Sequence, residues 1–112
     1  MTALFTHPSV SLNVEDAVLF VVGDVNVTLA ADLAAIGVKW LQATEHTSVI
    51  FDFNQVNKAS SVAISVLFEW LRACQTRDID VQAIHFSAPL RRLASLAELD
   101  NLIDHPASAL VV

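Results

Sequence analysis

The chain has 112 residues, 54% of them hydrophobic and only 16% charged, with six basic side chains against twelve acidic ones. This length suits one domain with a substantial core, so we expect a single domain over residues 1–112, and the net charge of −6 disfavours binding to nucleic acid. No stretch of about 18 apolar residues is present, as direct membrane insertion would require, and the N-terminus lacks the basic residues of a signal peptide, so we expect a cytoplasmic protein.

Two apolar runs, residues 9–14 and 17–22, predict the strands of a β-hairpin. Apolar residues then recur at helical spacing and predict a helix over residues 28–44, with Thr28 as its N-cap. A short apolar run at residues 48–53 predicts a buried strand. The first half of the chain is therefore expected to form two strands, a helix and a third strand.

A second helical pattern covers residues 60–76, and alternation over residues 80–86 predicts another strand. Ser87, followed by an early proline, predicts the start of a third helix that ends near Leu99. Residues 100–112 show no clear pattern beyond a short turn. Cys74 lies inside the second helical pattern and is expected to be a small buried hydrophobic residue.

Strands that alternate with helices need crossover connections, so the later strands should be parallel. We therefore predict an α/β fold with a mixed β-sheet of about four strands and helices packed mainly on one face. Six residues of two predicted central strands should be largely buried: Val49, Ile50, Phe51, Phe53, Val81 and Ile84.

The helix predicted over residues 60–76 has an apolar face that should cover the sheet, formed by Ala63, Ile64, Leu67, Trp70, Leu71 and Cys74. A narrow polar stripe lies opposite, formed by Ser65, Glu69, Arg72 and Thr76. The flanks of this stripe are apolar: Val62, Val66 and Ala73 on one side, and Phe68 on the other. Two explanations remain open, because either neighbouring helices or a partner protein can cover such flanks.

Ser60 and Ser61 stand at the corner where a buried strand leads into this helix. A helix N-terminus offers free backbone N–H groups and a partial positive charge. One serine can act as the N-cap, which contributes about 1 kcal/mol to stability. The other hydroxyl is then free for docking or regulation.

Four segments resemble the STAS-domain family: the strand end at residues 51–56, the corner at 59–64, the strand at 81–84 and the helix at 90–99. The resemblance covers about residues 9–104 and implies the STAS fold, which anti-sigma factor antagonists such as SpoIIAA share. Within the family the chain is most similar to the small, free-standing STAS subunit of a phospholipid ABC transporter.

The resemblance assigns roles to the corner. Ser61 falls on the hydroxyl residue that is phosphorylated in sigma-factor antagonists, and is thus a possible phosphorylation site. Ser60 falls on the aspartate of the family, so the carboxylate beside the phosphorylated hydroxyl is missing here. This departure favours docking by shape and hydroxyl contacts over a phosphate switch.

The resemblance implies a non-catalytic subunit that binds and stabilises or regulates an ABC-transporter ATPase, in a complex with a permease at the inner membrane. Such a transporter maintains the lipid asymmetry of the outer membrane. The alternative is an anti-sigma factor antagonist that is switched by phosphorylation of Ser61 and binds an anti-sigma factor kinase. In either case we expect the partner surface at the start and outer side of the second helix: Ser60, Ser61, Val62, Ser65, Val66, Glu69 and Arg72.

The sequence gives little support for an enzymatic function. The chain has two glycines, too few for a Gly-rich phosphate loop, and its four histidines are scattered without metal-ligand spacing. Ser61 and His85 could be imagined as a nucleophile and base, but no glycines are available for an oxyanion hole. We expect no enzymatic activity, no cofactor and no metal.

Overall fold

The computed structural model describes residues 1–109 of the chain. The elements follow in the order β1 (Thr2–Thr6), β2 (Val10–Glu15), β3 (Val18–Gly23), α1 (Val27–Ala43), β4 (Ser48–Gln55), α2 (Ser61–Arg77), β5 (Asp80–Phe86), α3 (Ala88–Leu96), α4 (Asp100–Asp104) and α5 (Pro106–Ala109). In residues 1–109, no helix is both long enough and apolar enough to cross a membrane.

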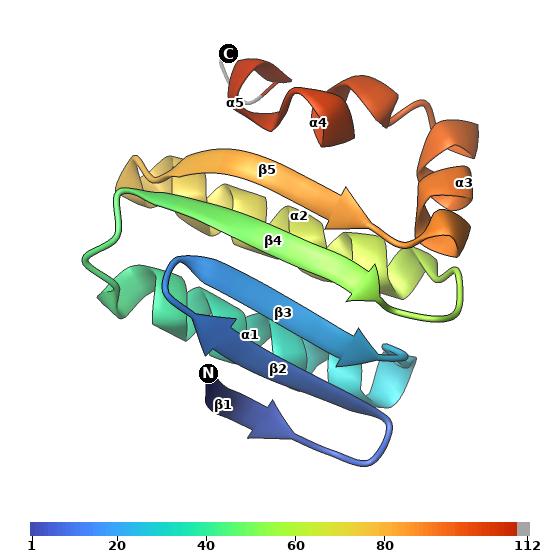
Figure 1. The fold of residues 1–112 in the computed structure, drawn as a ribbon, viewed down its shortest axis with the longest axis horizontal. Helices are drawn as coiled ribbons and strands as arrows, with labels where there is room; N and C mark the ends of the chain where they lie inside the picture. Colours follow the sequence, from blue (N-terminus) through green and yellow to red (C-terminus); the bar gives the residue numbers. More distant parts are fainter. Residues whose placement is uncertain (110–112) are drawn as a thin grey trace.

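All five strands form one sheet in the order β1-β2-β3-β4-β5. The first three strands pair antiparallel, while β3 with β4 and β4 with β5 pair parallel. Helices α1 and α2 lie side by side on one face of the sheet, and α3 to α5 lie along the outer side of β5 (Figure 1). The predicted mixed sheet with helices mainly on one face is confirmed.

The sheet has five strands where about four were predicted, because the N-terminal segment adds the edge strand β1. This strand is half exposed, and its register shifts between Ala3 and Phe5. Its burial therefore does not alternate, which leaves no period-two pattern to detect.

The core lies between the sheet and the two long helices. In β4, Val49, Phe51 and Phe53 face the helices and are fully buried or nearly so. The indole of Trp70 in α2 contacts both phenylalanines, with ring centroids 5.4 Å from Phe51 and 5.7 Å from Phe53. Five of the six predicted core residues are buried; Ile50 is only half buried, because strand alternation places it on the opposite face.

Two helix boundaries differ from the prediction. Helix α1 begins at Val27, because Asn26 rather than Thr28 is the N-cap and its side chain accepts a hydrogen bond from the backbone of Leu29 at 2.9 Å. The third helix is shorter than predicted: α3 ends at Leu96 rather than near Leu99, Glu98 adopts a left-handed conformation with φ of 59°, and a separate helix, α4, begins at Asp100. Residues 110–112 lie outside the described part of the chain.

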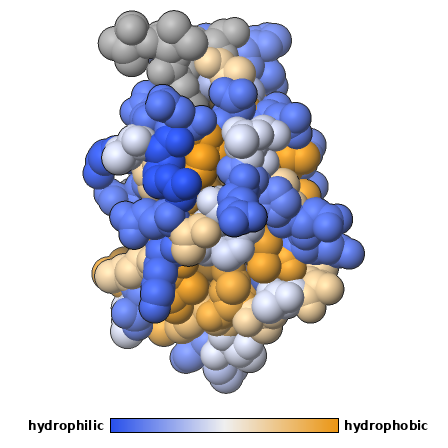
Figure 2. Space-filling model, turned by 90° about the vertical axis from the view of Figure 1, so that its left-hand side faces the viewer, coloured by the Kyte–Doolittle hydropathy of each residue, from blue (hydrophilic) through white to orange (hydrophobic). Residues whose placement is uncertain are grey.

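The surface is unevenly hydrophobic. In Figure 2, hydrophobic surface gathers in the lower half of the face shown, the half that holds β1 to β3 and α1 in Figure 1. The upper half of that face is mainly hydrophilic.

Candidate functional site

The corner between β4 and α2 places its two serines in different roles. Ser60 has an extended backbone and is the N-cap of α2, since its Oγ accepts a hydrogen bond from the N–H of Val62 at 3.1 Å. Ser61 is the first residue of the helix and is exposed, and its hydroxyl makes no hydrogen bond to any described residue. One serine therefore caps and the other remains available, as the sequence predicted.

The polar stripe of α2 continues from this corner along the outer side of the helix. The Ser65 hydroxyl donates to the carbonyl of Ser61 at 3.0 Å. One turn further, Arg72 Nη1 and Glu69 Oε1 form an ion pair at 2.9 Å, with 69% and 50% of their side chains exposed. An ion pair this exposed contributes little to stability, so both side chains remain available to a partner.

Helix α1 covers one apolar flank of the stripe. Val62 is half buried and Val66 only 2% exposed. Between the helices lies a shallow depression of about 190 Å³, lined by Ala30, Ala31, Ala34, Val62, Ser65, Val66 and Glu69. Val66 therefore belongs to the core and forms the floor of this depression, a correction to the expectation that it offers an exposed apolar contact.

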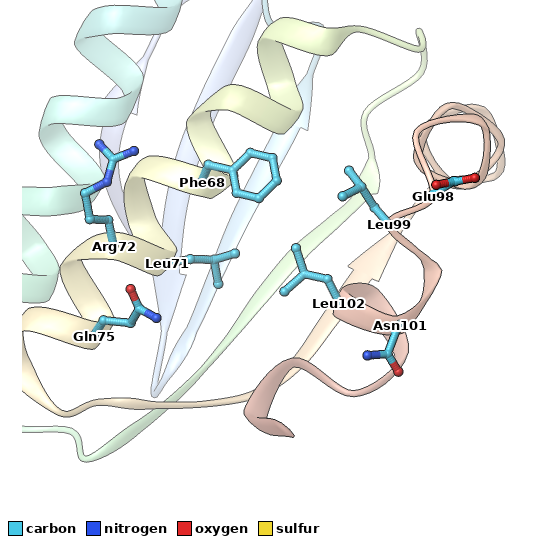
Figure 3. A pocket seen from close by; sticks show the side chains of 8 residues that line it. All are labelled: Phe68, Leu71, Arg72, Gln75, Glu98, Leu99, Asn101 and Leu102. Carbon is cyan, nitrogen blue, oxygen red and sulfur yellow. The ribbon is translucent and has the colours of Figure 1, made fainter. Parts of the chain in front are cut away.

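The opposite flank of α2 is open. Phe68 is 38% exposed, and together with Leu71 it faces Leu99 and Leu102 across a groove of about 510 Å³ (Figure 3). A neighbouring helix, α1, thus covers the flank of Val62 and Val66, whereas the flank of Phe68 borders a groove.

The structure adds two contributors that the helical pattern of α2 alone could not reveal. One is the set of α1 alanines that form the far wall of the depression. The other is Asp24, whose carboxylate accepts hydrogen bonds from the backbone of the loop that leads to the serines. Both come from segments about 30 residues earlier in the chain, so no local signal connects them to the corner.

Two further observations concern reactive and metal-binding side chains outside this corner. Burial raises the pKa of the Cys74 thiol to about 12, and the side chain is fully buried, which confirms it as a small core residue. Among the residues that the structure describes, no three His, Cys, Asp or Glu side chains are placed to hold a metal ion. The corner therefore combines a free hydroxyl, an exposed ion pair and a shallow depression between two helices.

Comparisons with known proteins identify the family and the fold. A family model described as "Mlab, STAS domain" matches residues 9–104. The fold is similar to that of a solved structure described as the anti-sigma factor antagonist SpoIIAA in its unphosphorylated form, with a TM-score of 0.67, 11% sequence identity and 85% of each chain covered. No curated protein sequence gives a significant match. Because the family model spans most of its length, the chain belongs to the STAS-domain family, with the MlaB type as the matching model.

Proposed function

We propose that this chain is the non-catalytic STAS subunit of an inner-membrane phospholipid ABC transporter, which binds and stabilises or regulates the ATPase. The partner would be an ATPase subunit of the MlaF kind in a complex with a permease, and the chain would lie in the cytoplasm, peripheral to the inner membrane through that complex. The transporter would maintain the lipid asymmetry of the outer membrane. The MlaB-type family match and the surface at the start of α2 support this proposal.

The observation that carries the proposal is the state of the two serines. Ser60 stands where the family has an aspartate, and its Oγ is already engaged as the N-cap. Ser61 next to it has a free hydroxyl at the N-terminus of a helix of 17 residues, where backbone N–H groups and the helix dipole favour a carbonyl or carboxylate of a partner. A corner in which serine replaces the aspartate next to the free hydroxyl suits a lasting protein contact better than a phosphate switch.

We define the docking face as Ser60, Ser61, Val62, Ser65, Glu69 and Arg72. The hydroxyls and the exposed ion pair provide a polar rim, and the depression beside α1 provides a place for a small apolar side chain of the ATPase. This combination of an apolar centre with a polar rim is common in protein interfaces. The low share of charged residues in the chain, 16%, also suits a permanent complex.

A second candidate follows from the exposure of Ser61. An exposed hydroxyl at the first position of α2 is accessible to a kinase, and the fold is similar to that of an anti-sigma factor antagonist. The alternative function is therefore an antagonist that an anti-sigma factor kinase phosphorylates on Ser61.

Co-expression separates the two candidates. The untagged chain is produced with its cognate ATPase and permease, the ATPase is captured through a tag, and the captured material is analysed by intact mass spectrometry. Stoichiometric recovery of the unmodified chain, and higher ATPase yield in its presence, is the expected result. Failure to co-purify, together with phosphate on Ser61 after incubation with an anti-sigma factor kinase and ATP, would replace the transporter function with the alternative.

A further inference from the structure

The loop between β4 and α2 is held by a carboxylate from another part of the chain. Asp24 Oδ1 accepts hydrogen bonds from the backbone N–H groups of Asn57, at 3.0 Å, and Lys58, at 2.9 Å. The partners are 33 and 34 residues apart in sequence. Asp24 follows β3 and the loop follows β4, and these two parallel strands end at the same side of the sheet (Figure 1).

Asp24 is itself fixed in place. Its backbone N–H donates to the carbonyl of Ser9 at 2.9 Å. The preceding Gly23 has φ of 105°, and a Cβ atom there would lie 2.3 Å from that same carbonyl oxygen, so only glycine permits this approach. The following residue, Val25, is 5% exposed and anchors the chain in the core.

The two ends of the loop are anchored without Asp24, whereas its middle is exposed. Val56 is fully buried and donates to the carbonyl of Phe53 at 3.2 Å, and Ser60 caps α2. Asn57, Lys58 and Ala59 between them are exposed. Among the described residues, Asp24 is the acceptor for the N–H groups of the first two, so it is the tertiary contact that fixes the course of the loop.

We infer that Asp24 is a positioning residue for the docking face, because its carboxylate sets the path of the loop that delivers Ser60 and Ser61. This inference rests on the function proposed above. Hydrogen bonds from N–H groups to an ionised carboxylate are stronger than neutral ones, and here one oxygen receives two. Without them the exposed loop is free to sample other conformations, and the partner must then restrict it on binding.

The test compares Asp24→Ala with Asp24→Asn, which keeps a side-chain oxygen of the same reach. Asp80→Ala is the matched control, because it removes the same charge from an exposed residue at the opposite end of the parallel strands. Two quantities are measured for each protein: amide hydrogen exchange at Asn57 and Lys58, and the Kd for the cognate ATPase subunit by biolayer interferometry. Thermal melts establish that each variant is folded.

We expect Asp24→Ala to speed exchange of the two amides and to raise the Kd about tenfold, the scale on which preorganisation of a loop acts. Asp24→Asn should keep most of the amide protection and most of the affinity of the wild type. Asp80→Ala should change neither the exchange rates nor the Kd. If Asp24→Ala does not fold, Asp24→Ser takes its place, since its side chain is too short to reach both amides.

The possible failures are distinguishable. Unchanged amide exchange in Asp24→Ala would overturn the inference at the level of the loop. Faster exchange with an unchanged Kd would overturn it at the level of the docking face. If the wild-type chain does not bind the ATPase, the proposed function fails and the positioning role with it, while the exchange data still establish whether Asp24 holds the loop.

Discussion

Gly37 in α1 lies directly against the indole of Trp70 in α2. A Cβ atom on Gly37 would lie 2.2 Å from Trp70 Nε1, closer than any real contact. That same indole N–H donates to the backbone carbonyl of Ala34 at 3.1 Å. The missing side chain of Gly37 thus makes room for a buried tryptophan, which in turn packs on the phenylalanines of β4.

The first prediction is that Gly37→Ala destabilises the protein, although alanine is usually the better helix former. The gain in helix propensity is about 1 kcal/mol. The clash forces the Trp70 ring to move and breaks its hydrogen bond to Ala34, which together should cost about 2–4 kcal/mol. We therefore expect urea denaturation to give a lower unfolding free energy than that of the wild type. The change in tryptophan fluorescence on unfolding should also be smaller than in the wild type.

The control for this prediction is Ala35→Gly in the same helix. Ala35 is exposed, so its replacement should cost only the propensity difference, about 1 kcal/mol. If Gly37→Ala proved more stable than the wild type, the close approach of the two helices would be refuted.

The second prediction separates the two serines by stability. Ser60→Ala removes the N-cap of α2 and should lower the unfolding free energy by about 1 kcal/mol. Ser61→Ala removes an exposed hydroxyl that makes no hydrogen bond to a described residue, so it should change the unfolding free energy by less than about 0.5 kcal/mol. Chemical denaturation of both variants decides the matter; equal losses would mean that the capping role is shared.

The third prediction concerns alkaline pH. Burial raises the pKa of Cys74 from 9.0 to about 12, which means that the folded state holds the thiol proton more tightly than the unfolded state. The contribution of this thiol proton to the unfolding free energy is fully present below pH 9 and is lost as the pH rises toward 12. Between these pH values Cys74 should make the unfolding free energy fall by up to about 1.4 kcal/mol per pH unit.

Cys74→Ala isolates this contribution. The variant should be less stable at pH 7, because a buried side chain is shortened. Its unfolding free energy should nevertheless fall less steeply than that of the wild type between pH 9 and 11. Parallel pH profiles of the two proteins would contradict the assigned burial of the thiol.

The fold was largely predictable because its signals are local. The apolar face of α2 follows from helical spacing, and all six of its residues are buried in the structure. The β2–β3 hairpin, β4 and β5 likewise come from short runs with clear alternation or continuous apolar character. The parallel order of the later strands follows from the crossover rule.

The features that sequence reasoning missed depend on tertiary geometry or on a choice between similar residues. Asn26 and Thr28 are both good N-caps, and only the extended backbone at Asn26 decides between them. The end of α3 is set by Glu98, a residue with no glycine-like signal, whose left-handed conformation is accompanied by a hydrogen bond from Leu99 to the carbonyl of Ala94.

The arrangement of the residues in the proposed docking face was predictable only in part. Ser61, Ser65, Glu69 and Arg72 lie on one side of α2, so the helical period brings them together, and Ser60 directly precedes the helix as its N-cap. The burial of Val66 depends on where α1 packs, and the contact of Asp24 with the loop spans more than 30 residues. Neither can be read from spacing within one helix.

The last prediction tests the docking face directly through Ser61→Glu. The residue is exposed at the first position of α2, and an acidic side chain near a helix N-terminus interacts favourably with the dipole, so folding should be retained. Binding of the ATPase should weaken by about 2 kcal/mol or more if the residue is central, because the larger charged group must be accommodated and desolvated. Affinity capture of the ATPase with wild-type and variant protein measures the effect, alongside thermal melts.

Thr47→Glu is the matched control, since it adds the same charge at an exposed residue of the α1–β4 loop, at the other end of the molecule from the start of α2 (Figure 1). It should capture the ATPase as well as the wild type does. Equal capture by a folded Ser61→Glu protein would remove Ser61 from the interface and leave the capping of α2 by Ser60 as the established role of the corner. Loss of binding in Ser61→Glu alone, with its melting temperature unchanged, would place the contact at the N-terminus of α2, because only the local shape and charge differ between the two variants.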